Sequence, residues 1–461
     1  MTQIVSIIYG PSISKAKEQL KKAAAEGADL AEIRLDRFEL EELGRLSELP
    51  RSLPLIFTFR KKAHGGACEL DDAERQSLFL RCLEANPDYC DIETDTESSF
   101  FEEVKKRHPK IKIIGSFHDL EKMPPLEETL DAMQKPHVSH YKLAVLVQSA
   151  SEAMKLLLFA RERENLTCIG LGEAGQITRI LGPLFGVGFC YAPIEKEDAL
   201  FGQIALSDLH GIYRFRMLSP KTLIYALIGH PVAKSVGHLY HNKSFPKTAV
   251  YVKIDLDIPE MPLFFSLIRK LPFAGLSVTM PLKELLGKFL TSVEPDAAAI
   301  GSVNTMKIEE EHWRGFNTDG KGALQALERH VKVKGKHVVV LGAGGSARAI
   351  IFEALQKGAK VTVLNRTVER REALAKEFGC KAAGLDELGK LSFDVLINSI
   401  PADLLFDAKE LPPKAVVMDI VYWEKETPLL KLAKERGCIA IGGMEMFEEQ
   451  ALLQQKIWFE K

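Results

Sequence analysis

The sequence predicts an α/β protein built from two parts, and three features of the chain carry this prediction. Residues 1–215 alternate short β-branched runs with amphipathic segments of helix length. The alternation restarts after Leu218-Ser219-Pro220, where a second α/β unit is expected to begin. A glycine-rich segment at residues 342–345 follows a strand-like run and precedes a helical pattern, as in nucleotide-binding folds. The length of 461 residues is sufficient for roughly two to four domains.

The composition is that of an ordinary globular protein. Hydrophobic residues make up 46% and charged residues 27%, which excludes a largely disordered or collagen-like chain. The 61 Lys and Arg residues nearly balance the 63 Asp and Glu residues, and the formal net charge is −2. No global field would therefore gather nucleic acid or an anionic membrane. The longest apolar runs, such as residues 338–341, are far shorter than a membrane helix. We expect neither nucleic acid nor a membrane as a partner.

The cysteines and the first residues favour a cytoplasmic protein without a metal. Residues 1–10 have neither a basic start nor a long apolar core, so no signal peptide is expected. The number of cysteines is odd and none has CxxC spacing, which argues against a disulfide framework or a zinc site. A reducing cytoplasm is the expected location. The cysteines are Cys68, Cys82, Cys90, Cys168, Cys190, Cys380 and Cys438.

Eight strand-like runs in the first part favour a closed (β/α)₈ barrel, the TIM barrel. Most of them are followed by a segment of helix length, such as residues 14–25 and 151–164, where apolar residues recur at helical spacing. Eight such units in about 215 residues fit the barrel. An open doubly wound sheet is the alternative that the pattern leaves open. The strand-like runs are residues 4–8, 30–35, 55–59, 89–93, 111–116, 141–145, 168–171 and 187–191.

The second part predicts two series of elements. The first series has strands at residues 223–228, 250–254 and 275–278, followed by a helical stretch. The second series begins with a strand at residues 337–341 and continues to Asp419 as glycine loop, helix, strand, helix, strand and strand. Two helices, at residues 427–436 and 445–459, close the chain.

These two series suggest the domain boundaries. We expect a barrel at residues 1–217 and a smaller α/β lobe at residues 221–325 that the C-terminal helix, residues 443–461, completes. A Rossmann lobe is expected at residues 326–442, because strands alternate there with helices after the glycine loop.

The glycine loop is typical of a dinucleotide site. Glycines allow the backbone to approach a pyrophosphate, and the following helix offers free N–H groups. An NAD site would place an acidic residue at the end of the next strand, whereas this strand ends in Asn365-Arg366-Thr367. Arg366 can pair with a 2′-phosphate, with Arg370 or Arg371 as helpers, so NADP is the expected cofactor. The candidate cofactor-binding residues are Gly342, Ala343, Gly344, Gly345, Ser346, Asn365, Arg366, Thr367, Arg370 and Gly443.

Three polar clusters precede the glycine loop. They are Gly229-His230-Pro231-Val232-Ala233-Lys234-Ser235, Gly275-Leu276-Ser277-Val278-Thr279-Met280-Pro281-Leu282-Lys283, and Gly301-Ser302-Val303-Asn304-Thr305 followed by Asn317-Thr318-Asp319-Gly320. In motif and order these segments resemble shikimate dehydrogenase. The resemblance implies that Lys283 and Asp319 form the catalytic pair. Hydride transfer between an alcohol and a ketone needs a partner for the hydroxyl proton, which a lysine beside a carboxylate can supply. It also implies substrate contacts from Ser235, Thr279, Asn304, Tyr422 and Gln450.

One departure from that family lies at Gly237. The family usually has a second serine at this place, and both serine hydroxyls contact the substrate carboxylate. Here Ser235 is followed by Val236-Gly237, so the second hydroxyl is missing. The preference for shikimate or quinate is therefore left open.

In the first part, charged residues gather where the predicted strands end, which is the position of active sites in barrel enzymes. Lys142 lies within the otherwise apolar sixth strand, where burial and neighbouring cations would lower its pKa and leave a nucleophilic amine. His118 ends the fifth strand and can carry a proton near neutral pH. Arg34, Arg60 and Arg179 suit an anionic substrate.

Six short motifs of this part occur in order. They are Glu32-x-Arg34-x-Asp36, Thr58-x-Arg60, Ser116-x-His118-Asp119, Lys142-x-Ala144, Thr178-Arg179 and Gly202-Gln203-Ile204-Ala205. Together they resemble type I 3-dehydroquinate dehydratase. The resemblance implies an imine between Lys142 and the substrate ketone, while His118 takes the C2 proton and then protonates the departing C1 hydroxyl. It also implies that Arg179 holds the carboxylate and that the ring hydroxyls are held by Glu32, Arg34, Arg60 and Gln203.

Two departures from this second family are His64 and Ala199. The family commonly has a glutamate at the place of His64, where it helps to orient the catalytic histidine, and a substrate-binding serine at the place of Ala199. Glu93 is an alternative group for orienting His118. Two imidazoles disfavour each other's protonated form, so we expect His64 to lie near the barrel mouth and to make at most a secondary contact with His118.

The two resemblances describe consecutive reactions of chorismate biosynthesis. They imply a bifunctional lyase and oxidoreductase that converts 3-dehydroquinate to 3-dehydroshikimate and then, with NADPH, to shikimate. These three metabolites are the expected small-molecule partners. Quinate dehydrogenase activity with NAD in the second half is one alternative, against which Arg366 argues. A non-catalytic regulator that senses pathway metabolites is another, against which the presence of Lys142, His118, Lys283 and Asp319 argues.

Overall fold

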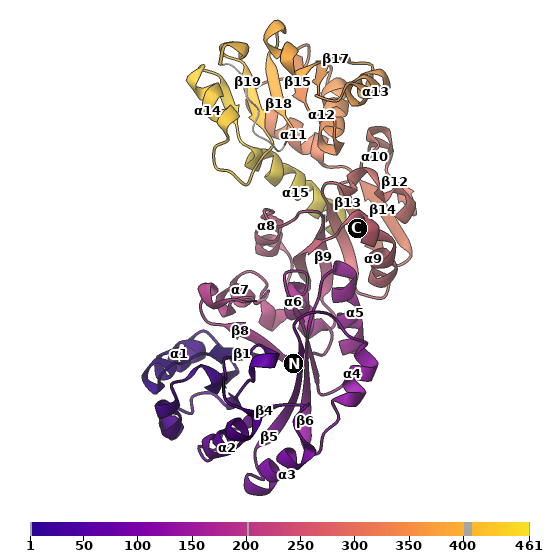
Figure 1. The fold of residues 1–461 in the computed structure, drawn as a ribbon. Coiled ribbons are helices and arrows are strands. Elements are labelled where there is room, and N and C mark those ends of the chain that lie inside the picture. Colours follow the sequence, from indigo (N-terminus) through magenta and orange to yellow (C-terminus); the bar gives the residue numbers. More distant parts are fainter. Residues whose placement is uncertain (1, 201, 401–407, 461) are drawn as a thin grey trace. The chain divides into compact units, whose positions relative to one another are not determined.

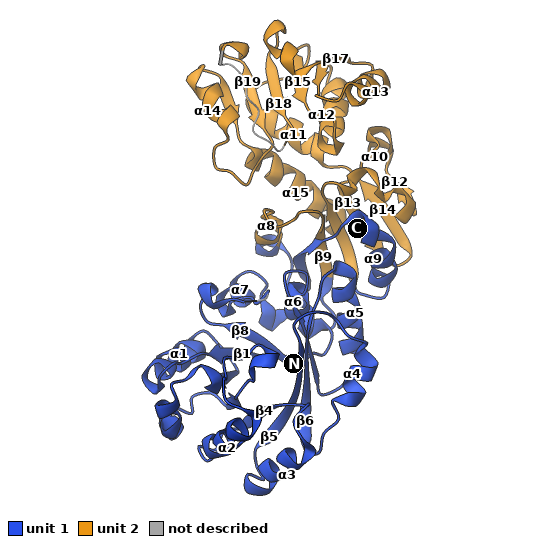
Figure 2. Cartoon of the chain, in the orientation of Figure 1, with its two compact units in different colours: residues 1–223, 242–272 blue, residues 224–241, 273–461 orange. Residues whose placement is uncertain are grey.

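The chain forms two compact units. In the computed structural model, which describes residues 2–200, 202–400 and 408–460, one unit comprises residues 1–223 and 242–272 and the other residues 224–241 and 273–461 (Figure 2). No described helix combines the length and the apolar character that crossing a bilayer requires.

The first unit contains a sheet of eight strands in the order β7-β6-β5-β4-β3-β2-β1-β8, whose neighbours are parallel. Strands β1, β4, β5, β6 and β8 are labelled in Figure 1. At the remaining seam, Gly188 N–H donates to Leu166 O at 3.4 Å, and Phe189 N–H donates to Oγ1 of Thr167 at 2.9 Å. The sheet is thus a nearly closed barrel; the barrel prediction is confirmed and the open-sheet alternative is wrong. The strands are β1 (Gln3–Ile8), β2 (Leu30–Arg34), β3 (Leu55–Thr58), β4 (Tyr89–Glu93), β5 (Lys112–Asp119), β6 (Val138–Leu146), β7 (Leu166–Leu171) and β8 (Phe189–Pro193).

Helices connect most of the barrel strands. In α1, Oγ of Ser12 accepts a hydrogen bond from Lys15 N–H, and the residues at helical spacing, including Ala16 and Leu20, are buried. Between β2 and β3 the chain forms two 3₁₀ segments, Leu35–Arg37 and Leu40–Glu48, instead of an α-helix. The helices are α1 (Ile13–Ala25), α2 (Asp72–Leu83), α3 (Ser98–Arg107), α4 (Leu126–Ala132), α5 (Ala150–Arg161), α6 (Gln176–Leu181) and α7 (Leu206–Gly211).

The second unit begins with a mixed sheet, whose strands in this unit follow the order β9-β11-β13-β14-β12. Strands β13 and β14 form an antiparallel hairpin that the sequence did not predict, and β11 pairs with β9 in parallel. These strands are β9 (Leu223–Gly229), β11 (Phe273–Val278), β12 (Ser292–Val293), β13 (Thr305–Glu309) and β14 (His312–Phe316). Other elements of this stretch of the chain are α8 (Gly237–Ser244), β10 (Ala249–Asp255), α9 (Met261–Ile268) and α10 (Pro295–Ile300).

A second sheet in this unit is parallel throughout, with the order β17-β16-β15-β18-β19-β20. Alternate residues of β15 enter two different hydrophobic clusters: Val338 and Val340 enter one, and Val339 and Leu341 the other. The sheet is thus covered on both faces, as in a Rossmann fold. The elements are α11 (Asp319–Leu327), β15 (His337–Leu341), α12 (Gly345–Gln356), β16 (Lys360–Leu364), α13 (Val368–Phe378), β17 (Lys381–Ala383), β18 (Val395–Asn398), β19 (Val416–Asp419), α14 (Pro428–Glu435), β20 (Ile439–Ile441) and α15 (Gly443–Phe459).

Candidate active sites

In the barrel, Lys142 of β6 has its ammonium group among carboxylates, with only 5% of its side chain exposed. Its Nζ donates to Oδ2 of Asp91 at 2.5 Å and lies 3.5 Å from Oε1 of Glu32. The ring of Tyr191 on β8 lies against the same group, with its centroid 4.4 Å from Nζ. A buried ammonium group depends on such partners, because taking an isolated charge out of water costs several kcal/mol.

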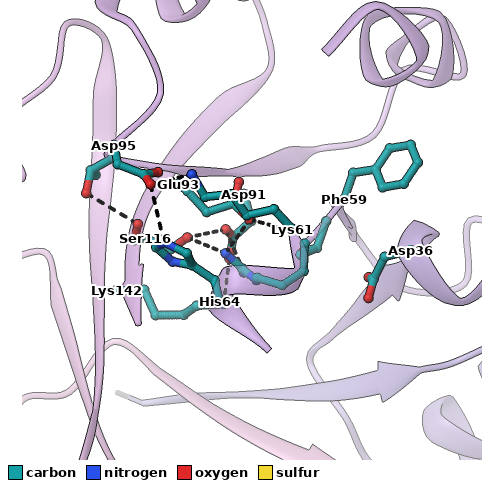
Figure 3. Close-up of polar contacts among 12 residues, drawn as sticks. Asp36, Phe59, Lys61, His64, Asp91, Glu93, Asp95, Ser116 and Lys142 are labelled. Carbon is teal, nitrogen blue, oxygen red and sulfur yellow. Dashed lines mark hydrogen bonds and ion pairs between the residues drawn. The ribbon is translucent and has the colours of Figure 1, made fainter. Parts of the chain in front are cut away.

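Asp91, on β4, is the carboxylate at the centre of this cluster, and the sequence-based prediction did not include it. Its Oδ1 accepts a hydrogen bond from Oγ of Ser116 at 2.6 Å (Figure 3). The same oxygen lies 2.8 Å from Nη2 of Arg60. Burial alone would raise the pKa of Asp91, but the cations of Arg60 and Lys142 outweigh it and hold this pKa below its usual value. Asp91 is therefore an anion held between two buried cations.

Glu93, two residues along β4, adds a second carboxylate to the cluster. It accepts a hydrogen bond from Lys61 N–H at 3.0 Å and forms ion pairs with Arg60 at 3.3 Å and Arg75 at 3.2 Å. Its carboxylate is thus engaged with other groups, and the described residues show no hydrogen bond between Glu93 and His118. Asp91 and Glu93 lie on the same face of a strand with a two-residue period, which is the sequence signal that indicates both.

His118, at the end of β5, is the candidate base. Its Nδ1 is buried and has no hydrogen-bond partner among the residues that the structure describes. Burial, together with the cations of Arg60 and Lys142, holds the pKa of His118 well below 6.5, so the ring is neutral near pH 7. The ring of His64 stands edge-on to it with 5.8 Å between centroids. Nε2 of His64 lies 3.4 Å from Oδ2 of Asp95, and both residues are labelled in Figure 3.

Arg179, in α6, is a buried cation that forms no ion pair with any residue in the described part of the chain. Its Nε has no hydrogen-bond partner there, and burial lowers its pKa to about 10. Arg34, in contrast, donates two hydrogen bonds to Asp36, at 2.9 and 2.8 Å. An unpaired buried cation is costly unless a ligand brings the missing anion. Arg179 is therefore the arginine best suited to a substrate carboxylate.

The other predicted barrel residues are held by their own neighbours. Oε1 of Glu32 accepts a hydrogen bond from Oγ1 of Thr58 at 2.8 Å. The amide oxygen of Gln203 accepts from Leu200 N–H at 3.1 Å, within its own loop. Ala199 ends the 3₁₀ turn Lys196–Asp198 and offers no hydroxyl.

In the second unit, Lys283 and Asp319 form an ion pair. Lys283 lies in the 3₁₀ turn Leu282–Glu284 after β11, and Asp319 is the first residue of α11. Nζ of Lys283 donates to Oδ2 of Asp319, and the two side chains are only 14% and 6% exposed. The other oxygen, Oδ1, accepts from Nδ2 of Asn304 at 2.7 Å. The two predicted catalytic residues are thus in direct contact.

Three predicted substrate-binding residues lie around this pair or near it in the chain. Oε1 of Gln450, on α15, lies 3.5 Å from Nδ2 of Asn304 and 3.4 Å from Oγ1 of Thr318. Thr279 follows β11, and its N–H donates to Ile228 O at 2.9 Å. Thr318 was not predicted, although it lies directly before Asp319 in the motif.

Ser235 and Tyr422 form a second polar group. Burial raises the pKa of Tyr422 and outweighs the opposite effect of the neighbouring Ser235 hydroxyl, so the Tyr422 hydroxyl stays protonated. Oγ of Ser235 accepts a hydrogen bond from Gly237 N–H at 3.2 Å. The backbone of Gly237 thus orients the one serine hydroxyl that the motif retains.

The glycine loop, between β15 and α12, leaves room for a phosphate. Gly342 has a φ of +106°, a conformation that favours glycine. No side chain caps α12, and a Cβ on Gly344 would meet nothing within 4 Å. The first N–H groups of α12 are therefore open to an anion. Gly443, another predicted cofactor residue, begins α15.

The end of β16 carries the residues expected to distinguish NADP from NAD. Arg366 is exposed and has no ion pair among the described residues, whereas Nη1 of Arg371 donates to Asn365 O at 3.0 Å. Nδ2 of Asn365 donates to Thr367 O at 3.2 Å. Arg370 is exposed on the first turn of α13. An available guanidinium group and the lack of a carboxylate at Asn365 fit a 2′-phosphate.

Comparison with known proteins agrees with both halves. The family model for type I 3-dehydroquinase matches residues 4–220, that for the shikimate dehydrogenase substrate-binding domain residues 227–306, and that for shikimate/quinate 5-dehydrogenase residues 324–414. The shikimate biosynthesis protein AroDE of Chlamydia pneumoniae is 34% identical, over 99% of this chain and 95% of its own. The chloroplastic bifunctional 3-dehydroquinate dehydratase/shikimate dehydrogenase of Arabidopsis thaliana is 32% identical, over 99% of this chain and 81% of its own.

A solved structure resembles the second half. A shikimate dehydrogenase in complex with NADP+ has 37% sequence identity and a TM-score of 0.51, covering 53% of this chain and 92% of its own. Fold, sites and relatives thus define a barrel lyase joined to an NADP-dependent dehydrogenase. The chain belongs to the family of bifunctional type I 3-dehydroquinases/shikimate dehydrogenases. The resemblances seen in the sequence are confirmed in both halves.

The position of His118 predicts the pH dependence of the dehydratase. A histidine accepts a proton only when its ring is neutral, and the lowered pKa keeps His118 neutral well below pH 6.5. We expect dehydratase kcat, measured at saturating substrate where the imine has formed, to stay constant as the pH falls through 6.5. The His64→Gln variant removes one of the groups that lower this pKa, so its acidic limb should lie at higher pH. A pH–rate profile measures both limbs, and a parent limb centred at pH 6.5 would contradict the assignment.

Arg366 predicts the cofactor preference. The Arg366→Asp variant loses a charge-assisted hydrogen bond to the 2′-phosphate and adds repulsion. Loss of such a bond corresponds to about 10–150-fold weaker binding of NADP, with relatively better use of NAD. Binding titrations and the ratio of kcat/KM with the two cofactors test this. Lys360→Asp, at the opposite end of β16, is the matched control for the charge change. An unchanged ratio in Arg366→Asp would refute the role.

Proposed function

We propose that this chain catalyses two consecutive reactions of the shikimate pathway and that the two clusters described above are their active sites. The observation that carries the proposal for the barrel is Lys142, buried on a strand together with Arg179, a cation that lacks an anion. A lysine nucleophile and an unpaired arginine suit a substrate that is both a ketone and a carboxylate. This substrate is 3-dehydroquinate.

The positions of Lys142, His118 and Arg179 suggest the steps of the dehydration. Nζ of Lys142 attacks the ketone carbon, two of its ammonium protons leave with the ketone oxygen as water, and a protonated imine forms. The neutral ring of His118 takes the C2 proton, and the electron pair is drawn toward the imine. The same proton then passes from His118 to the C1 hydroxyl, which departs as water. Hydrolysis of the imine releases 3-dehydroshikimate and restores Lys142. Arg179 holds the carboxylate throughout.

The second half reduces this product to shikimate. NADPH, when bound, supplies the hydride. Lys283 donates a proton to the oxygen that gains charge, and Asp319 holds the ammonium group in place. The hydroxyls of Ser235 and Tyr422 suit the substrate carboxylate. Thr279, Asn304 and Gln450 bind the ring hydroxyls. The glycine loop binds the pyrophosphate of the cofactor, and Arg366 binds its 2′-phosphate.

We also propose the domain boundaries expected from the sequence: a barrel at residues 1–217, a substrate lobe at residues 221–325 with helix 443–461, and a cofactor lobe at residues 326–442. In support, the family models match residues 4–220, 227–306 and 324–414. A cytoplasmic location is proposed for the whole chain, because all seven cysteines are free and five of them are buried.

The two activities predict separable losses. With 3-dehydroquinate and NADPH, the parent chain should consume NADPH, followed by nicotinamide absorbance. Lys142→Ala should consume none, because no imine can form. It should still consume NADPH when 3-dehydroshikimate is supplied, since Lys283 and Asp319 are intact. Borohydride added with substrate should fix a ligand mass on Lys142 of the parent. Dehydratase activity in Lys142→Ala would contradict the imine assignment. A parent chain inactive in both assays would favour the metabolite-sensing alternative.

A further inference from the structure

One polar side chain of the glycine loop contacts the catalytic pair of the dehydrogenase. Ser346 is the second residue of α12. Its Oγ accepts a hydrogen bond from Nζ of Lys283 at 3.0 Å and donates one to Oδ2 of Asp319 at 3.1 Å. The hydroxyl therefore closes a triangle with the two charged groups. The sequence alone placed Ser346 with the cofactor.

Close backbone packing fixes the hydroxyl in this place. A Cβ on Gly345 would lie 3.2 Å from both Cβ and Cδ of Lys283, so glycine lets the start of α12 reach the lysine. A Cβ on Gly320, in α11, would lie 2.3 Å from Ala349 O in α12. The helix that carries Asp319 and the helix that carries Ser346 are thus in backbone contact. Ser346 has little freedom to leave the pair.

The triangle determines where the ammonium hydrogens point. An ammonium group has three hydrogens and no acceptor. One of those of Lys283 is given to Asp319 and one to Ser346. Asp319 is held in turn by Asn304 through its other oxygen. One hydrogen of Lys283 therefore remains for the substrate oxygen.

We propose that Ser346 is a positioning residue for the Lys283–Asp319 pair, which aims the third ammonium hydrogen at the substrate oxygen that gains or loses its proton. The inference rests on the proposed function of that pair. Ser346 then has two roles. Its hydroxyl contacts the catalytic pair, while its backbone N–H stays available to the cofactor phosphate. Hydride transfer and proton transfer then share one structural element, the first turn of α12.

The test is Ser346→Ala in the full chain, assayed for shikimate oxidation. Loss of a hydrogen bond to a charged group predicts a fall in kcat of about 10-fold. The KM for shikimate and the Kd for NADP, measured by titration without turnover, should not change, because the hydroxyl is assigned to neither ligand. A solvent isotope effect on kcat should increase, since the proton transfer is the step made worse. The dehydratase rate of the same sample reports the concentration of intact chain.

The matched control is Thr427→Val. The hydroxyl of Thr427 also starts a helix of this unit and donates to a buried carboxylate, Asp419 at 2.7 Å, away from the pair. Its kcat should equal that of the parent. An unchanged kcat in Ser346→Ala overturns the inference, and so does a raised Kd for NADP with kcat at saturation unchanged, which would assign the hydroxyl to the cofactor. If Lys283→Ala or Asp319→Asn retains full activity, the proposed function of the pair fails instead.

Discussion

The ion pair between Lys142 and Asp91 is the interaction on which the barrel site depends. Lys142 and Arg60 are both buried, and two cations so placed would destabilise the barrel without an anion between them. Asp91 contacts both cations, and Glu93 and Glu32 add further negative charge beside Arg60 and Lys142. Arg179 forms no ion pair within the described chain. Burial and the same two cations, Arg60 and Lys142, lower the pKa of His118. One arrangement of charge thus holds the proposed nucleophile, leaves a cation available for an anion and keeps the proposed base neutral.

The dehydrogenase half uses a related device on a different fold. A lysine again pairs with a mostly buried aspartate, and neutral side chains complete the contacts of the carboxylate: Asn304 at one oxygen and Ser346 at the other. In the barrel this part is taken by Ser116, which donates to Asp91. In both halves a hydroxyl or amide donates to the carboxylate beside the lysine, and in the barrel Arg60 contacts that carboxylate as well. The two sites therefore share a physical arrangement, although their scaffolds differ.

The sequence predicted most of the fold because β-branched runs and helical spacing are local signals, as the eight barrel strands demonstrate. The sequence-based prediction missed the hairpin of β13 and β14. Its turn places Glu310 at φ +52°, whereas the usual sequence signal for such a turn is glycine or asparagine. The same prediction named Lys142 and Lys283 but not Asp91, because the two-residue period that aligns Asp91 with Glu93 says nothing of which groups they contact. The contact of Ser346 depends on two helices meeting, which no local pattern contains.

The central claim is that Asp91 is the counter-ion that the buried cations require, and urea unfolding of Asp91→Asn tests it most directly. Hydrogen exchange of peptides from β4 to β6 reports the barrel, while the three tryptophans, at positions 313, 423 and 458, report the second unit as an internal reference. Breaking a buried pair should destabilise the barrel by about 3–5 kcal/mol. Asp95→Asn, which removes a half-exposed carboxylate of the same region, should cost less than about 1 kcal/mol. Equal, small losses in both variants would contradict the account.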